Sequence, residues 1–232
     1  MIWRNLQRRF LLFLYILSSP FMCFSATASF TSGAILIVTG IFTFRHVRAK
    51  SSIPFASIPL LFGIQQIIEG MVWISFSSPI FHSVVTYLYV MFSHVLWPVF
   101  VPVSIWLIEK NPVRKKILCG ISIVWAIVSI YLFTCSVVGP VTCSIVQKSI
   151  AYQINVPYPL PSFFLYFFAT CAGSMVSSSL KIRVFGTAML LSFFVAHLLY
   201  PETLFSVWCF FAAILSVIIY IHMKDLRKLV AS

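Results

Sequence analysis

Three polar side chains that could do chemistry interrupt the long apolar stretch 53–76. Gln65 and Glu69 are four residues apart, and Gln66 lies on the flank of the same helical stripe. Glu69 is the only acid inside any predicted membrane span, where a carboxylate costs roughly 2.5–3.5 kcal/mol on insertion scales. One carboxylate beside two carboxamides favours either binding of a cation or small polar molecule, or a structural hydrogen bond to a neighbouring helix.

Two histidines extend this set. His94 lies near the middle of the predicted span 82–108, four residues before Pro98, which has no N–H to give to the carbonyl of residue 94. We therefore expect the helix to kink there. His197 lies near the outer end of the predicted span 184–200. We predict an outward-facing polar pocket formed by Ser25, Thr27, Gln65, Gln66, Glu69, His94, His197 and Glu202.

The same residues allow an alternative. Glu69, His94 and His197 could hold zinc with one open position, so that a bound water attacks a lipid or an ester. This would be a metal-dependent intramembrane hydrolase, and a membrane sensor or complex subunit is a third candidate. We favour binding or transport of a small polar solute or cation, which needs no cofactor, because carboxamide-rich sites bind more often than they catalyse. The remaining histidines, His46, His82 and His222, lie at span ends, where we expect solvent around them.

Composition sets the class of protein. The chain has 232 residues, of which 61% are hydrophobic and 9% are charged, whereas a soluble domain carries about 25% charged residues. A lipid bilayer is therefore the expected solvent. The net charge of +12 does not indicate nucleic acid, because the basic residues form short clusters between apolar spans.

Seven apolar stretches predict an all-α bundle of seven transmembrane helices. The predicted spans cover residues 26–44, 53–76, 82–108, 117–138, 162–179, 184–200 and 203–221. With the first span running inward, the loops on the inner side hold Arg45, Arg48, Lys50, Lys110, Arg114, Lys115, Lys116, Lys181, Arg183, Lys224, Arg227 and Lys228, and the outer loops hold only Lys148. The positive-inside rule then places the N-terminus outside and the C-terminus inside.

Residues 1–21 precede the membrane domain 22–232 and have three interpretations. Arginines, a short apolar run and Ser18-Ser19-Pro20 are typical of a signal peptide. An uncleaved extra helix and an extension upstream of initiation at Met22 are the alternatives.

The connection 139–161 is the one sizeable outer loop. Two β-favouring runs, 141–147 and 150–156, predict a short hairpin over residues 141–156 with Lys148-Ser149 between the strands. Cys135 and Cys143 lie near each other at this end, and form either a disulfide in an oxidising compartment or two free thiols.

The run Met22-Cys-Phe-Ser-Ala-Thr-Ala-Ser-Phe30, with the stretch 58–73 and Leu96-Trp97-Pro98, resembles a family of uncharacterised bacterial multi-pass membrane proteins. The likeness covers most of residues 22–232. It implies a multi-pass protein of the bacterial inner membrane and brings no activity with it. It also implies that residues 1–21 are an extension. The oligomeric state is not indicated.

Overall fold

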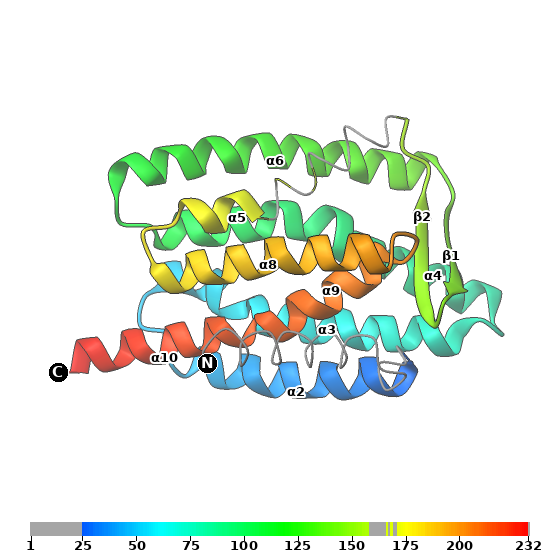
Figure 1. Cartoon of the computed structure of the whole chain (residues 1–232), viewed down its shortest axis with the longest axis horizontal. Coiled ribbons are helices and arrows are strands. Elements are labelled where there is room, and N and C mark those ends of the chain that lie inside the picture. The colour runs from blue at the N-terminus through cyan, green and yellow to red at the C-terminus, as the bar shows by residue number, and fades with distance from the viewer. Residues whose placement is uncertain (1–24, 158–165, 167, 169–170, 232) are drawn as a thin grey trace, which may run out of the picture.

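The computed structural model describes residues 25–157, 166, 168 and 171–231, with side chains up to residue 225. Most of these residues are helical, and the helices run along the long axis of the molecule (Figure 1). The helices are α2 (Ala26–Phe44), α3 (Ile53–Ser75), α4 (Pro79–Val90), α5 (Trp97–Ile108), α6 (Pro112–Val138), α8 (Leu180–Leu199), α9 (Leu204–Leu215) and α10 (Val217–Ala231). A 3₁₀ turn, Lys50–Ser52, precedes α3, and a π-helical segment, Met91–Leu96, joins α4 to α5.

Six helical segments in the described part of the chain are long and apolar enough to cross a membrane. They are Ala26–Phe44, Lys50–Ser75, Pro79–Ile108, Pro112–Val138, Leu180–Leu199 and Leu204–Asp225. Each corresponds to one predicted span. The predicted span 162–179 lies partly outside the described residues, and the segment 1–21 lies wholly outside them. The number of seven spans therefore stays a prediction.

The clusters of basic residues lie where helices begin and end, at one end of the bundle. In Figure 1 the α2–α3 and α5–α6 connections, the start of α8 and the end of α10 lie at one end of the bundle, the basic end. Arg45, Lys110 and Lys181 belong to these connections. The hairpin, the α3–α4 turn and the α8–α9 turn lie at the opposite end, the hairpin end (Figure 1).

Close packing of α2 against α3 fixes the helix that carries the polar stretch. A Cβ atom on Gly40 would lie 2.7 Å from the backbone nitrogen of Leu60, and one on Gly63 would lie 2.8 Å from that of Ile37. Neither position has room for a side chain, so glycine allows the two backbones to meet. The contact brings Ser32 of α2 within reach of Gln66.

The predicted hairpin is confirmed. Strand β1 (Val141–Val146) pairs antiparallel with β2 (Ser149–Ile154). The turn lies at Gln147-Lys148, one residue earlier than predicted, and both residues have positive φ, 49° and 62°. A two-residue turn of this kind matches the twist of the strands, although without glycine the left-handed backbone costs about 1–2 kcal/mol per residue. Packing of β2 offsets that cost, because the rings of Tyr152 and Tyr89 stack with centroids 4.1 Å apart.

The predicted disturbance before Pro98 takes the form of the π-helical segment rather than a break. Pro98 has no N–H, so the carbonyl of Ser93, five residues earlier, receives no helical hydrogen bond from it. The Tyr166 hydroxyl donates to that carbonyl instead, at 2.5 Å. The Ser129 hydroxyl of α6 donates to the carbonyl of Val95 at 2.7 Å. Two side chains thus satisfy two of the carbonyls of the π segment.

Candidate functional site

Glu69 lies in a chain of hydrogen bonds that joins α2, α3 and α9. Its carboxylate accepts one hydrogen bond from the Ser206 hydroxyl and a second, 3.2 Å long, from Gln66 Nε2. Gln66 Oε1 accepts in turn from the Ser32 hydroxyl at 3.2 Å. Glu69 is only 2% exposed and Gln66 is fully buried. Neutral hydroxyl and amide groups therefore solvate the carboxyl group in place of water.

Gln65 joins the same stretch to α5. The indole nitrogen of Trp97 donates to Gln65 Oε1 at 2.6 Å. The Trp97 ring also stacks on Phe62, with centroids 3.9 Å apart and an interplanar angle of 20°. Gln65 is fully buried, so this bond replaces the water that the amide oxygen loses on folding.

Three buried polar atoms beside this network have no hydrogen-bond partner among the described residues: Gln65 Nε2, the Tyr89 hydroxyl and the Tyr152 hydroxyl. The Cys209 thiol lies against Gln65 and Tyr89, but a thiol is a weak hydrogen-bonding group. Burial, followed by the nearby Glu69 charge, raises the pKa of Tyr152 well above its ordinary value. This hydroxyl therefore stays protonated. Unpaired buried polar atoms are rare and indicate a place for a water or an ion.

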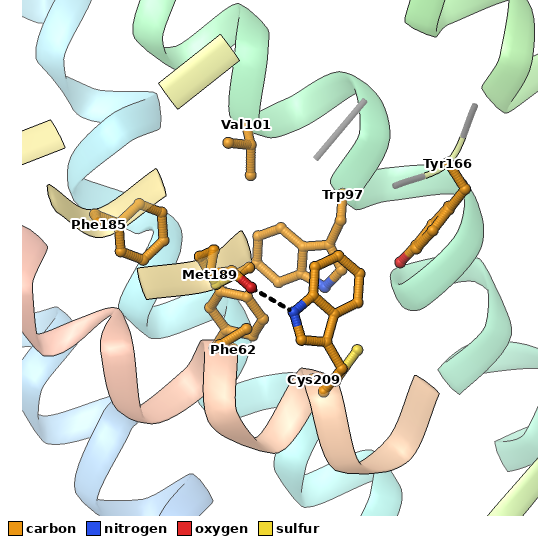
Figure 2. Close-up of a pocket in the computed structure, with 9 residues that line it drawn as sticks. Phe62, Trp97, Val101, Tyr166, Phe185, Met189 and Cys209 are labelled. Carbon is orange, nitrogen blue, oxygen red and sulfur yellow. Dashed lines mark hydrogen bonds between the residues drawn. The ribbon is translucent and has the colours of Figure 1, made fainter. Parts of the chain in front are cut away.

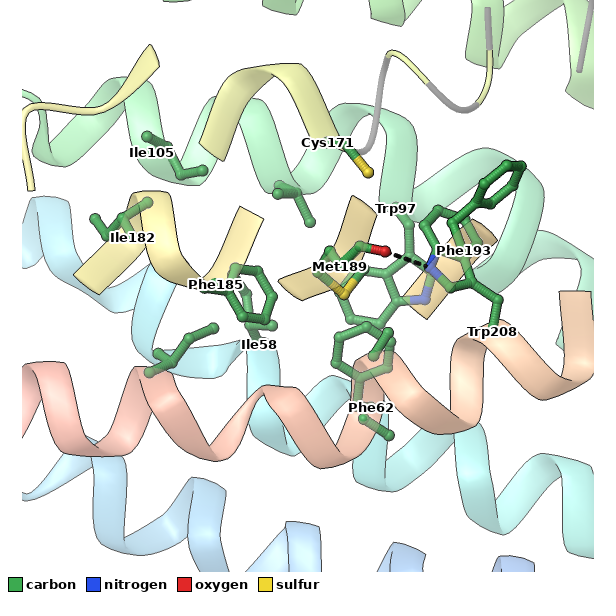
Figure 3. Close-up of a cluster of buried hydrophobic side chains, with 14 of the residues drawn as sticks. Ile58, Phe62, Trp97, Ile105, Cys171, Ile182, Phe185, Met189, Phe193 and Trp208 are labelled. Carbon is green, nitrogen blue, oxygen red and sulfur yellow. Dashed lines mark hydrogen bonds between the residues drawn. The ribbon is translucent and has the colours of Figure 1, made fainter. Parts of the chain in front are cut away.

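The space next to the network is small. A cavity of about 20 Å³ is lined by Phe62, Trp97, Val101, Tyr166, Phe185, Met189, Trp208, Cys209 and Ala212 (Figure 2). The Trp208 indole donates to the Met189 carbonyl at 3.1 Å across this space. Figure 3 shows the apolar side chains that surround it, among them Ile58 and Phe193. The cavity has room for one water molecule and none for an organic solute.

The structure brings together Gln65, Gln66 and Glu69 and places the other predicted pocket residues elsewhere. His94 is buried, but its Nδ1 lies 2.7 Å from the Ser93 hydroxyl and its ring lies 4.2 Å from that of Phe205. His197 is exposed and stacks on Phe193.

The two residues predicted near the N-terminus of the first span do not reach the network either. Ser25 caps α2 by accepting from the Ala28 N–H at 3.3 Å, and Thr27 is exposed. Glu202 is exposed in the α8–α9 turn. The hydrogen bonds thus join Gln66 and Glu69 to Ser32 and Ser206 in a buried cluster, and the pocket open to the outside stays a prediction.

The alternative zinc site finds no support in the side-chain arrangement. Among the residues whose side chains are described, no group of three or more His, Cys, Asp or Glu could hold a metal ion. Glu69 is bonded to Ser206 and Gln66, and no hydrogen bond connects it to His94. Cys135 and Cys143 are free thiols, which is the second of the two alternatives that the sequence leaves open.

Sequence reasoning missed the partners of Glu69 as well as a second buried acid. Ser32 and Ser206 are small polar residues within apolar spans, a weak signal that does not identify a partner helix. Glu109 accepts hydrogen bonds from the backbone N–H groups of Lys110, Asn111 and Ser178 and from the Ser177 and Ser178 hydroxyls, at 2.7–3.3 Å. This acid ties the α5–α6 connection to the segment before α8, at the basic end.

In the part of the chain that the structure describes, six helices are long and apolar enough to cross a membrane and a polar cluster is buried in the core, which is typical of a helical membrane protein. The chain belongs to the family of unknown function DUF6629, which matches residues 22–231. The match is in keeping with the resemblance to an uncharacterised family. No curated protein and no solved structure matches the chain.

Proposed function

We propose that this chain is a multi-pass protein of the bacterial inner membrane that binds or transports a small cation at the cluster formed by Gln65, Gln66, Glu69 and Ser206. The proposal narrows the small polar solute or cation expected from sequence. The nearby cavity of about 20 Å³ is too small for an organic solute, so an inorganic cation such as Na⁺, or a proton, is the better candidate of the ligands expected from sequence.

The observation that carries the proposal is the absence of a cationic partner for Glu69 among the described residues. Its two hydrogen bonds come from neutral groups, the Ser206 hydroxyl and the Gln66 side-chain amide. A buried carboxylate without a counter-charge is costly. Either a proton or a bound cation therefore neutralises Glu69. Carboxylate, amide and hydroxyl oxygens are the ligands that hard cations prefer.

A cation would reach the cluster from the hairpin end of the bundle. Tyr152 of β2 stacks on Tyr89 of α4, and the charge of Glu69 acts on the Tyr152 hydroxyl. The hairpin thus covers the end of the bundle that lies next to the cluster. In the proposed orientation this end faces outward and the basic end faces the cytoplasm, as the positive-inside rule predicts. The structure then represents a closed form.

The experiment compares Glu69→Gln with Glu202→Gln in the full chain. Glu69→Gln keeps the size of the side chain and its hydrogen-bonding positions but removes the charge, whereas Glu202 is an exposed acid of the same type. Binding of Na⁺ and K⁺ is measured as the increase in the melting temperature in the sodium or potassium salt compared with the choline salt. Proton and Na⁺ flux is measured in proteoliposomes.

We expect wild-type protein and Glu202→Gln to behave alike, and Glu69→Gln to lose at least tenfold in cation affinity or flux. If Glu69→Gln retained wild-type flux and the wild-type response to cations, the carboxylate would have a structural role only and the proposal would be wrong.

A further inference from the structure

A second group of polar side chains meets at the hairpin end, outside the Glu69 cluster. It comprises Ser75 at the end of α3, His82 in the first turn of α4, and Cys143 in β1. His82 Nδ1 lies 2.8 Å from Ser75 Oγ, and His82 Nε2 lies 3.4 Å from Cys143 Sγ. Three separate elements thus place a thiol, an imidazole and a hydroxyl in line. This is the arrangement of a nucleophile, a base and a residue that orients the base.

The hydrogen bonds of Ser75 assign the tautomer of His82. The Ser75 hydroxyl has one proton, which it donates to the Val72 carbonyl at 2.8 Å. Ser75 Oγ must therefore accept from His82 Nδ1–H. His82 Nε2 then carries a lone pair, and this lone pair faces the Cys143 thiol. The hydrogen-bond network thus fixes which ring nitrogen holds the proton.

The thiol depends on this base for its reactivity. Burial raises the pKa of Cys143, and a hydrogen bond with Thr86, 3.3 Å from the sulfur, acts in the opposite direction. The thiol is therefore neutral at neutral pH, and the thiolate is the reactive form. An adjacent imidazole that accepts the proton as the sulfur attacks removes this difficulty.

The surroundings indicate an apolar substrate. His82 and Cys143 are both half-buried, so each retains a surface that a substrate can reach. The Phe76 ring lies 4.4 Å from the His82 ring and is 40% exposed, and Ile80 in the same turn is 82% exposed. An exposed apolar rim next to a nucleophile favours a substrate with a hydrocarbon chain.

We propose that Cys143 is a nucleophile that takes an acyl group from a carboxylic ester at the hairpin end, with His82 as the general base and Ser75 as the positioning residue. The sulfur bonds to the carbonyl carbon of the ester while His82 Nε2 accepts the thiol proton. The bond from that carbon to the alkoxy oxygen then breaks, and Nε2 returns the proton to the departing oxygen. The products are a thioester at Cys143 and an alcohol, so no oxidant or metal is required.

The test uses the full-length protein in detergent with p-nitrophenyl acetate and p-nitrophenyl octanoate as acyl donors. Release of nitrophenolate gives the rate, and mass spectrometry of peptides gives the acylated residue. We expect a burst of about one nitrophenolate per chain, an acyl group on Cys143, and faster reaction of the octanoate because of the apolar rim.

Three variants and one matched control separate the proposed roles from simple exposure of a thiol. His82→Asn keeps an N–H donor for Ser75 but has no base, and should slow acylation by about 10²-fold or more. Ser75→Ala should slow the saturated rate without changing the half-saturating ester concentration, whereas Ser75→Thr, which keeps the hydroxyl, should restore it. Cys135→Ala, in nearby α6, should leave the rate unchanged.

Each result decides between the proposal and its rejection. Acylation of Cys135 and Cys143 at equal rates would mean that neither thiol is activated. A wild-type rate in His82→Asn would exclude His82 as the base. Unchanged melting temperatures in the slow variants show that the loss is chemical rather than a failure to fold.

Discussion

The indole nitrogen of Trp97 donates a 2.6 Å hydrogen bond to the side-chain oxygen of Gln65, and this bond joins α5 to α3 in the apolar interior. Both side chains are at most 3% exposed. A water that took the place of either partner would find few other polar groups, because the adjoining cavity is lined mostly by apolar side chains.

Trp97→Phe should therefore destabilise the protein. The substitution keeps an aromatic ring against Phe62 but leaves Gln65 Oε1 without a donor, at a cost of about 1–3 kcal/mol. Unfolding in mixed micelles measures the loss. Trp106→Phe is the control, because Trp106 is only partly buried and packs at the edge of the core. Equal stability of the two variants would contradict the importance of the Trp97–Gln65 bond.

The Tyr166 hydroxyl should contribute more to stability while residue 98 is proline. Tyr166→Phe leaves the Ser93 carbonyl without a donor, and we expect a loss of about 1–3 kcal/mol in the free energy of unfolding. In a Pro98→Ala background the restored N–H can serve a carbonyl of the π segment, so the same change should cost less. A double-mutant cycle should show a coupling of about 1 kcal/mol. Strict additivity would show that Pro98 is not the cause of the unsatisfied carbonyl.

Two glycine-to-alanine substitutions should have opposite effects. A Cβ on Gly40 would lie 2.6–2.7 Å from Leu60, so Gly40→Ala should push α2 away from α3 and cost about 1–3 kcal/mol. A Cβ on Gly120 in α6 would meet no atom within 4 Å, so Gly120→Ala should be neutral or stabilise by up to about 1 kcal/mol. Thermal unfolding of the two variants measures both effects.

Glu109 should make the free energy of unfolding depend on pH between about pH 4.5 and pH 2. Burial alone would raise the pKa of Glu109, but the hydrogen bonds from Ser178, Asn111 and Ser177 outweigh it and lower the pKa to about 2 from an ordinary 4.5. The folded state favours the ionised form. The resulting stabilisation is complete above pH 4.5 and is lost as the pH falls to about 2.

Glu109→Gln should accordingly cost about 1.5–3 kcal/mol at neutral pH. The difference from wild type should shrink below pH 4.5, because the wild-type carboxyl group then also becomes neutral. The free energy of unfolding of both proteins between about pH 2 and pH 7 measures this. A difference that did not vary with pH would show that the charge of Glu109 contributes nothing.

The sequence predicts the helices well because each helix depends on residues that are close together along the chain. Apolar runs of about 18 or more residues and the basic clusters between them indicate spans without knowledge of the fold. The hairpin could also be predicted, since β-favouring residues flank a short polar turn. The predicted turn lies one residue too late because neither Gln147 nor Lys148 is a residue type that normally indicates positive φ.

The partners within the site could not be predicted because they depend on which helices touch. Gln65, Gln66 and Glu69 share one helix, and their spacing predicts that they lie together. Ser206 is 137 residues from Glu69 along the chain, and no spacing rule connects α9 with α3. His82 illustrates the same limit: its position at a helix end predicts solvation, yet β1, far along the chain, covers it.

The π segment Met91–Leu96 also determines the direction in which the side chains of α5 point relative to those of α4. Residues eight apart in an uninterrupted α-helix differ by about 80° in direction, at about 100° per residue. A π segment accommodates about one extra residue and turns the following helix back by roughly 100°. Tyr89, under the hairpin, and Trp97, against Gln65, therefore point the same way within roughly 20°. Deleting one residue from 91–96 would turn the segment into an ordinary α-helix and leave the Trp97 indole facing Gln65, because seven residues at about 100° each also end within roughly 20° of the direction of Tyr89.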